Sequence, residues 1–321
     1  MSLPVVVACD KFKGTFSAAE VCAAIARGLR AGGREAVELP VADGGEGTLE
    51  VLVGALGGEV RTAPATDALG RPIEGRWALL ADGRAVVEVA EASGLARLAE
   101  DERDPWAAST YGTGQLIAAA AAEAGEVIVA AGGSATTDGG AGALAALEEA
   151  GARPRLVVAC DVRTEWQDAA RVYGPQKGAD PATVARLERR LEELADAAPK
   201  DPRGVPMTGC AGGLGGGLWA HLGAKLVSGA ALVLDAIGFD AAMRGARFVV
   251  CGEGKLDEQT LAGKAAGEVA TRCRQGGVAC HAVVGVNALD PFRARVLDLQ
   301  SVIEARTIPE LEAAGRALAE R

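Results

Sequence analysis

The sequence predicts an α/β protein in which both ends of the chain form one parallel-sheet domain and the middle forms a second, inserted domain. The N-terminal part has the order strand, glycine turn, helix twice in succession, and the C-terminal third repeats it. Such alternation is typical of a parallel sheet covered by helices. Residues 59–90 instead contain three short strands separated by turns, which predicts a mixed sheet. A length of 321 residues also favours two domains.

The domain formed by the chain ends is expected to consist of residues 1–57 and 241–321. Its first strand is predicted at 4–9 and its first helix at 17–31, where Ser17 and Glu20 have the spacing of a capping box. Four further strands and three further helices follow from the same alternation of apolar runs and amphipathic segments. The strands are expected at 36–41, 246–251, 279–284 and 299–303, and the helices at 46–55, 264–275 and 309–320.

The inserted α/β domain is expected at 58–240. After its three short strands the pattern predicts helices at 109–124, 139–150 and 214–222, with strands at 126–131 and 155–160. Val184, Leu187, Leu191 and Leu194 then recur at helical spacing. The charged residues of that helix, which include Arg190 and Glu193, are predicted to form a solvated face.

Composition excludes several classes of function. A formal net charge of −10 and an aromatic content of 3% argue against a nucleic-acid binder, which needs a basic and often aromatic surface. The seven cysteines contain no CxxC pair, so buried, reduced thiols are expected rather than a zinc site or a disulfide scaffold. No apolar run is long enough to cross a membrane, and no signal peptide is apparent. Cytoplasm is the expected compartment.

Four glycine-rich loops carry nearly all the candidate chemistry. They lie at 10–15, 42–48, 132–140 and 252–264, and each follows a predicted strand. Ligands of open α/β sheets bind beyond the carboxyl ends of the strands, so these loops are candidates for one site. A single acid in such a loop can equally be a helix cap, as Asp10, Asp43, Glu46 or Asp138 could be. The coincidence of four acid-bearing loops favours a ligand site.

The loop at 252–264 has the residues of a phosphate site, but it is not a Walker A loop. Glu258 and Ala265 stand where that motif requires Gly and Ser or Thr. A relaxed dinucleotide-binding match at 215–220 has no strand before it and is weak. A GxSxG motif is absent, and the two histidines, His221 and His281, are expected to be packed.

Phosphoryl transfer would use these residue types well. It needs carboxylates for Mg²⁺, cations and amides for the phosphates, and an acceptor for the proton of the nucleophile. The carboxylates available are Asp10, Asp43, Asp138, Asp161 and Asp257. The cations available are Lys13, Lys177, Lys255 and Lys264.

Seven ordered blocks resemble the bacterial glycerate kinases of the two-domain type. DKFKGT at 10–15 is similar to the opening of that family, and the resemblance spans roughly residues 5–285. The other six blocks are ADGGEGT, the run at 109–114, GGSATTDGG, VYGPQKGA at 172–179, AGGLGGGL at 211–218 and GEGKLDEQTLAGK. Cys9, Lys11 and Thr137 depart from the usual family residues. The chain also looks shortened after 139–150 and after 161–164.

The resemblance implies a Rossmann-like domain carrying the inserted domain, with the active site in a cleft between them. It further implies ATP-dependent phosphorylation of D-glycerate, in most members at the 2-hydroxyl. The expected cofactors are ATP and Mg²⁺, and the protein is expected to be a monomer or homodimer. A nicotinamide-dependent hydroxy-acid dehydrogenase and a weakened, ligand-binding relative of the kinases are the alternatives.

The expected site residues fall into three groups. Catalytic roles are expected for Asp10, Lys13, Asp43 and Asp257, with Asp257 as the preferred proton acceptor. Mg²⁺ is expected on Asp43, Asp138 and Asp257. Substrate or nucleotide is expected to contact Gly44, Gly45, Glu46, Gly133, Ser134, Thr136, Lys177, Glu253 and Lys264.

Overall fold

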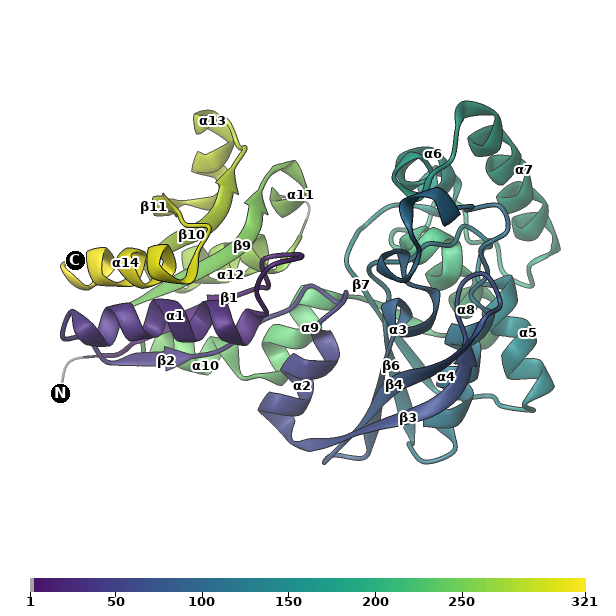
Figure 1. Ribbon diagram of the computed structural model, residues 1–321, viewed down its shortest axis with the longest axis horizontal. Coiled ribbons are helices and arrows are strands. Elements are labelled where there is room, and N and C mark those ends of the chain that lie inside the picture. The colour runs from purple at the N-terminus through teal and green to yellow at the C-terminus, as the bar shows by residue number, and fades with distance from the viewer. Residues whose placement is uncertain (1–2, 262) are drawn as a thin grey trace. The chain divides into compact units, whose positions relative to one another are not determined.

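The chain folds into two compact units, which the computed structural model describes over residues 3–261 and 263–321 (Figure 1). The terminal unit is Met1–Asp43 with Ala230–Arg321, and the inserted unit is Gly44–Gly229. The boundaries predicted from the sequence, after residues 57 and 240, both lie further along the chain than the boundaries in the structure. The difference arises because α2 (Thr48–Leu56) packs on the strands of the inserted unit, whereas α9 (Gly229–Ala236) contributes to the core of the terminal unit.

The terminal unit is built on one sheet of five parallel strands in the order β11-β10-β9-β1-β2. Its strands are β1 (Val5–Cys9), β2 (Ala36–Glu38), β9 (Phe248–Leu256), β10 (Cys280–Asn287) and β11 (Leu299–Glu304). All residues of β1 are buried, as expected for a parallel strand covered on both faces. Since β9, β1 and β2 are neighbours, their carboxyl ends lie together at one edge of the sheet.

Helices cover both faces of this sheet. The side chains of β1 alternate, so Val5 and Val7 pack under one helical layer while Val6 packs under the other. The first layer contains α1 (Ala18–Ala31) beside α14 (Ile308–Ala319), as Figure 1 shows. The second contains α9, α10 (Phe239–Arg244) and α12 (Ala265–Gly276). The short helices α11 (Glu258–Leu261) and α13 (Pro291–Ala294) complete the unit. The capping box of Ser17 and Glu20 is confirmed.

The largest departure from the predicted elements is at β9. The sequence predicts a strand that ends at Cys251 and a glycine loop from Gly252, but β9 continues through Leu256. Its glycines permit close packing within the sheet: a Cβ on Gly252 would lie 2.4 Å from the carbonyl oxygen of Val283. Glu253 is therefore held on a strand and not on a loop.

The inserted unit contains the mixed sheet that the sequence predicts. The strand order is β3-β4-β5-β6-β7-β8, with the pairs β3–β4 and β4–β5 antiparallel and the other pairs parallel. The strands are β3 (Gly58–Thr66), β4 (Pro72–Leu80), β5 (Arg84–Glu88), β6 (Glu126–Ala130), β7 (Leu156–Cys160) and β8 (Lys225–Ser228). The short edge strand β8 was not predicted, because only four residues, partly exposed, form it.

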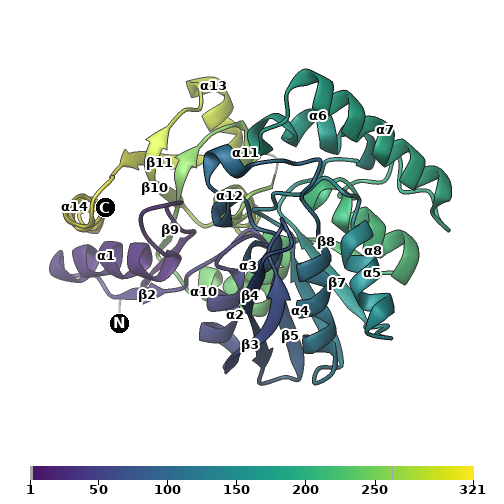
Figure 2. The ribbon, with the colours of Figure 1, turned by 45° about the vertical axis from the view of Figure 1, so that its right-hand side comes forward.

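The helices of the inserted unit pack on this sheet around one apolar core, which includes Leu116, Val129 and Leu214. Figure 2 shows α4, α5 and α8 beside the strands. Besides α2, the helices are α3 (Val89–Ser93), α4 (Tyr111–Ala121), α5 (Ala141–Glu149), α6 (Ala169–Tyr173), α7 (Pro181–Ala197) and α8 (Leu214–Leu222). A short 3₁₀ turn, Cys210–Gly213, precedes α8, so the glycine match at 215–220 follows no strand.

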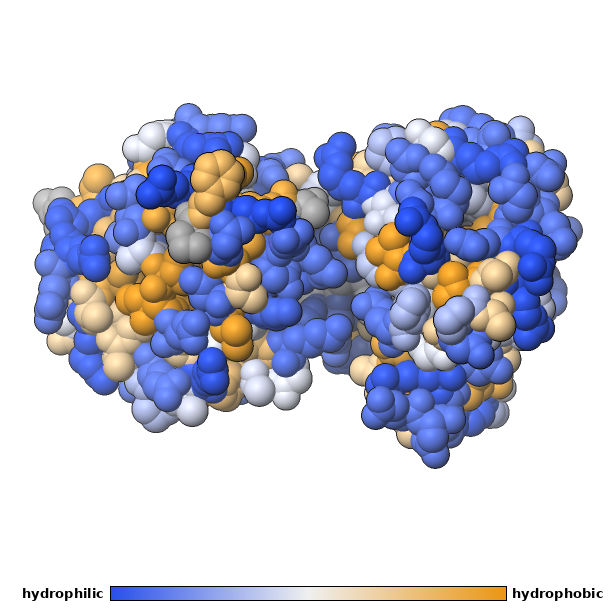
Figure 3. All heavy atoms as spheres, turned by 90° about the horizontal axis from the view of Figure 1, so that it is seen from above, coloured by the Kyte–Doolittle hydropathy of each residue, from blue (hydrophilic) through white to orange (hydrophobic). Residues whose placement is uncertain are grey.

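The surface and the buried thiols agree with the composition. Hydrophilic residues cover most of the face drawn in Figure 3. Within the described part of the chain, no helix combines the length and apolar character that a membrane crossing needs. All seven cysteines are free and buried, as predicted. His281 is buried as expected, but the expectation for His221 is wrong, because its side chain at the end of α8 is exposed.

Candidate functional site

Three carboxylates of the terminal unit lie near one another: Asp10 after β1, Asp43 after β2 and Glu253 within β9. Asp10 directly follows β1, is 8% exposed, and accepts a hydrogen bond from the Lys11 amide at 2.7 Å. Burial, and next the charge of Asp43, raise the pKa of Asp10 well above its ordinary value, and Glu253 adds to this effect. A cluster of like charges is a feature of functional sites, since a bound cation or a transferred proton relieves it.

Glu253 is the second buried acid of this group. Its Oε1 accepts a hydrogen bond from the Thr260 hydroxyl at 2.6 Å. Burial is the main cause that raises its pKa to about 7, and the carboxylates of Asp257 and Asp43 act in the same direction. The bond from Thr260 and the charge of Lys264 oppose the increase. Thr260 is a residue that the sequence analysis missed, because its role depends on the strand conformation of Glu253.

The raised pKa of Glu253 predicts a pH-dependent stability. Its stabilising contribution is complete below 4.5, the ordinary value, and is lost as pH rises through about 7, because the folded state then buries a charge. The difference corresponds to at most about 3 kcal/mol. Glu253→Gln should therefore raise the Tm by about 5 °C at about pH 8.5, with a gain that vanishes near pH 4.5. Thermal unfolding across this pH range measures it.

Glu35→Gln, which changes an exposed acid of the same unit, is the matched control and should leave the pH dependence of the Tm unchanged. Parallel pH curves for wild type and Glu253→Gln would contradict the buried, protonated state of Glu253.

Asp257 and the predicted lysines lie around these acids but are more exposed. The carboxylate of Asp257 accepts a hydrogen bond from the Gln259 amide at 3.0 Å, and it lies 3.4 Å from the Lys255 ammonium. Lys264 is the N-cap residue of α12 and is half-buried, whereas Lys13 is exposed. The terminal unit thus combines buried acids with more accessible cations, as a site for a metal–phosphate group requires.

The loop at 42–48 belongs to both units. Asp43 is the last residue of the first segment of the terminal unit, and Gly44 begins the inserted unit. Gly44 has a φ of 93°, and a Cβ there would lie 2.8 Å from the carbonyl oxygen of Ala159. The predicted Gly45 is buried next to it, and Glu46 is exposed. The glycines of this block therefore let the chain pass close to the end of β7.

The inserted unit contains a second candidate cluster, centred on Lys177. This residue is 3% exposed, and its ammonium donates a hydrogen bond to the carbonyl oxygen of Thr136 at 2.5 Å. Burial lowers its pKa to about 8, and the carboxylates of Asp138 and Asp161 oppose that decrease. A buried lysine that still carries charge at neutral pH is an unusual and costly arrangement, which favours a role toward an anionic ligand.

The loop at 132–140 is held rigidly around Thr136. The hydroxyls of Ser134 and Thr136 are 2.8 Å apart, and Ser134 also accepts a bond from the Thr136 amide. Gly212, with a φ of 65°, passes so close that a Cβ would lie 1.9 Å from the Thr136 oxygen. Gly133 has a φ of 76°. The two glycine blocks at 132–140 and 211–218 are thus packed against each other beside Lys177.

Asp138 has a different environment from the other predicted metal ligands. Its carboxylate accepts bonds from the Thr110 amide and hydroxyl, both at 2.8 Å, and from the amides of Gly140 and Gly142 at 3.1 and 3.2 Å. These bonds join the beginnings of α4 and α5. Because its carboxylate accepts four hydrogen bonds, Asp138 has a structural role in the loop.

In the described residues no three His, Cys, Asp or Glu side chains are grouped so that they could hold a metal ion by themselves. This observation is compatible with magnesium, which proteins commonly hold through one or two carboxylates while substrate phosphates and water supply the remaining ligands. The pair Asp10 and Asp43 fits that pattern, because their mutual repulsion raises the pKa of Asp10. Asp43, Asp138 and Asp257 are divided between the two units.

Comparison with known proteins agrees with a site for a metal–phosphate group. The model of the glycerate kinase family matches residues 5–153 and 148–314. The two matches overlap at residues 148–153, around the end of α5. The chain is 39% identical to a glycerate kinase of Halalkalibacterium halodurans over 322 aligned residues, which cover 88% of this chain and 85% of the relative. It is 37% identical to glycerate 2-kinase of Escherichia coli, covering 82% of this chain and 80% of the relative.

Comparison of the fold with solved structures points to the same family. A crystal structure from Salmonella typhimurium LT2, of a protein named as a glycerate kinase 2, superposes with a TM-score of 0.83 at 29% identity, covering 100% of this chain and 98% of that one. A family match over most of the chain, identities above a third with curated enzymes, and this shared fold lead to one conclusion. The chain belongs to the glycerate kinase family and is a phosphotransferase.

Proposed function

We propose that this glycerate kinase transfers the γ-phosphoryl group of ATP to the 2-hydroxyl of D-glycerate and releases 2-phosphoglycerate. Family membership supports ATP and glycerate as substrates, and the E. coli relative named glycerate 2-kinase supports the 2-hydroxyl as acceptor. The observation that carries the proposal is the buried cation Lys177 beside the glycine loop at 132–140, together with the acid cluster of Asp10, Asp43 and Glu253.

Magnesium would be held by Asp43, with Asp10 or Asp257 beside it, and would neutralise the phosphate charge of the bound nucleotide. Asp10 and Asp43 fit a cation because the charge of Asp43 raises the cost of charging Asp10. Lys13 and Lys264, with the amides of Gly44 and Gly45, would bind phosphate oxygens. Cations and oriented amides stabilise the charge that a phosphoryl group carries in the transition state.

The glycerate carboxylate would be bound by Lys177 and Ser134. A charge-assisted hydrogen bond from a buried ammonium is stronger than one between neutral groups, so Lys177 is suited to fix an organic acid. Thr136 would hold Lys177 in place through the bond to its carbonyl oxygen. The prediction that these groups act together with the terminal unit on one pair of substrates stays a prediction.

Asp257 is the proposed proton acceptor for the glycerate hydroxyl, and Asp10 is the alternative because its raised pKa suits a base. Asp257→Asn should lower kcat by a factor of about 10²–10⁴, the usual contribution of a general base. Steady-state rates with Mg-ATP and D-glycerate measure the effect. Asp290→Asn, which alters a comparable capping carboxylate at α13, should leave kcat within about twofold. A near-normal rate for Asp257→Asn would remove Asp257 from the mechanism and leave Asp10.

The product identifies the reaction. The protein is incubated with Mg-ATP and D-glycerate, and enolase is then added with or without phosphoglycerate mutase. Phosphoenolpyruvate formed with enolase alone identifies 2-phosphoglycerate. If it forms only after the mutase is added, the product is 3-phosphoglycerate. Failure to phosphorylate any of several small hydroxy acids would contradict the proposed kinase activity altogether.

A further inference from the structure

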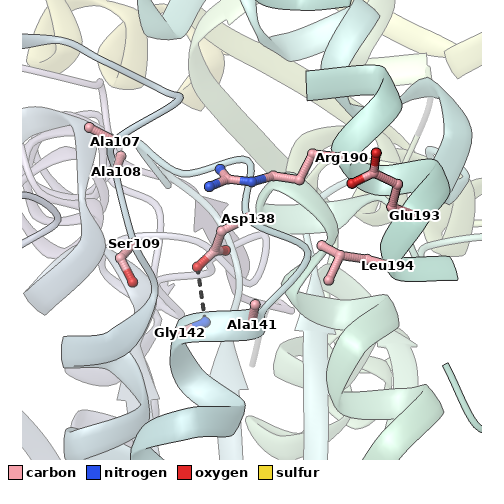
Figure 4. A pocket seen from close by; sticks show the side chains of 9 residues that line it. All are labelled: Ala107, Ala108, Ser109, Asp138, Ala141, Gly142, Arg190, Glu193 and Leu194. Carbon is pink, nitrogen blue, oxygen red and sulfur yellow. Dashed lines mark hydrogen bonds between the residues drawn. The ribbon is translucent and has the colours of Figure 1, made fainter. Parts of the chain in front are cut away.

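The inserted unit contains a cavity of about 290 Å³, which none of the proposed catalytic steps uses. Its walls come from residues just before α4, from the beginning of α5 and from one side of α7 (Figure 4). Four charged or hydroxyl side chains line it, and its remaining surface is made of alanines, a glycine and Leu194. The polar groups are Ser109, Asp138, Arg190 and Glu193.

Arg190 is held over this cavity without an acidic partner. Its guanidinium donates a hydrogen bond to the carbonyl oxygen of Trp106 at 3.0 Å and lies 4.3 Å from the centre of the Trp106 ring. Within the described residues it forms no salt bridge with any carboxylate. The prediction of a solvated face is therefore wrong at Arg190, which is half-buried and extends across the cavity in Figure 4. A positioned guanidinium with unused N–H groups is suited to a planar anion.

The opposite wall supplies a second hydrogen-bond donor, the Ser109 hydroxyl, and a carboxylate that is already hydrogen-bonded, that of Asp138. Ser109 accepts a hydrogen bond from the Tyr111 amide at 3.1 Å, and this leaves its hydroxyl hydrogen available to a ligand. Asp138 also borders the cavity, but its oxygens already accept four hydrogen bonds. The donors that remain for a ligand are thus Arg190 and Ser109.

Size and charge define the class of ligand. Sites for drug-sized molecules measure about 300–1,000 Å³, so this cavity suits a small molecule and not a nucleotide. The lining contains one guanidinium and two carboxylates, those of Asp138 and Glu193, and both carboxylates would repel a dianion such as phosphate. A monoanion avoids most of that cost, and Leu194 with Ala141 offers an apolar surface for a short carbon chain.

We propose that this cavity is a second binding site, specific for a short aliphatic monocarboxylate. The ligand's carboxylate pairs with the guanidinium of Arg190 and accepts a hydrogen bond from Ser109, while its alkyl chain lies against Leu194. A bound acid would contact Asp138, which lies in the loop at 132–140. The carbonyl oxygen of Thr136 in the same loop accepts the hydrogen bond from Lys177. The site is independent of the proposed reaction, because no phosphoryl transfer step requires it.

Binding is tested without nucleotide, so that the result does not depend on kinase activity. Propionate is titrated into the ¹⁵N-labelled protein, and the indole N–H resonance of Trp106 is followed after assignment with Trp106→Phe. Wild type should show a saturable shift with a Kd on the order of 1 mM. Arg190→Gln should weaken binding at least about tenfold, in keeping with the loss of a charge-assisted pair.

Arg186→Gln is the matched control, because the Arg186 guanidinium also lies over the Trp106 ring, at 4.1 Å, but does not line the cavity. It should retain binding within about twofold of wild type. Absence of a saturable shift in wild type, or equal affinity in Arg190→Gln, would overturn the site. Tighter binding of inorganic phosphate would overturn the assignment to a monoanion. Tighter binding of D-glycerate would overturn the assignment to an aliphatic acid.

Discussion

Replacement of Lys177 by methionine is expected to lower kcat/KM for D-glycerate by a factor of about 10³ while the protein remains folded. Lys177 is the only lysine of the inserted unit that the structure describes as buried. Its proposed contact with the substrate carboxylate would be made without competing water, where a charge-assisted bond has its largest effect. Methionine has a similar length but carries no charge, so the variant removes that contact with little change in packing.

The stability of this variant separates a functional from a structural role. The pKa of Lys177 falls from 10.5 to about 8, so at pH 7 the folded state pays for burying a charge. The contribution that favours folding is present above 10.5 and is lost as pH falls through about 8. Lys177→Met should consequently have a Tm at pH 7 equal to or above that of wild type.

Steady-state kinetics and thermal unfolding check both parts of this prediction. Lys225→Met, at an exposed lysine of β8, is the control and should change neither kcat/KM nor Tm appreciably. If Lys177→Met lost activity only in proportion to a lower Tm, Lys177 would be a structural residue. If its kcat/KM were normal, the carboxylate contact would be wrong.

Asp43→Asn is expected to reduce activity by about 10² or more and to raise the Mg²⁺ concentration for half-maximal rate about tenfold. The amide retains the size of the side chain but lacks the negative charge that attracts a divalent cation. Asp43 raises the pKa of Asp10, so its carboxylate lies within electrostatic reach of the neighbouring acid. Removing one member of such a pair leaves the metal with a weaker set of oxygen ligands.

Initial rates measured against free Mg²⁺ at saturating ATP test this expectation. Glu38→Gln changes an exposed acid on β2 in the same unit and should preserve the wild-type magnesium dependence. A reduced rate with an unchanged magnesium requirement would assign Asp43 to a role other than metal binding.

Much of the fold could be predicted because strands such as β1 are short, buried apolar runs followed by a polar turn. β9 is the exception, and it shows where prediction from local sequence patterns fails. Gly252 and Gly254 are typical of loops, but here both lie in a strand, and at Gly252 the carbonyl oxygen of Val283 on the neighbouring strand approaches too closely for a side chain. Local preference was overridden by packing between strands that are distant in sequence, which no local pattern records.

The candidate site likewise depends on contacts between residues that are distant in the sequence. Sequence motifs identified Lys177 and the loop at 132–140 separately, and only the fold brings the Lys177 ammonium to the Thr136 carbonyl. Arg190 was assigned to a solvated face because its helix is highly charged, yet its stacking on Trp106 directs it over a cavity. That contact joins residues far apart in the chain, so helical spacing could not reveal it.

The division of the chain has a consequence for its synthesis on the ribosome. The inserted unit is one continuous segment and can begin to fold once Gly229 has emerged. The terminal unit has to wait, because β1 pairs with β9, and the partner of Val5 is Phe248. At about 5–20 residues per second, the apolar β1 strand remains without that neighbour for on the order of tens of seconds. During this interval β1 can pack only against elements already synthesised, such as α1.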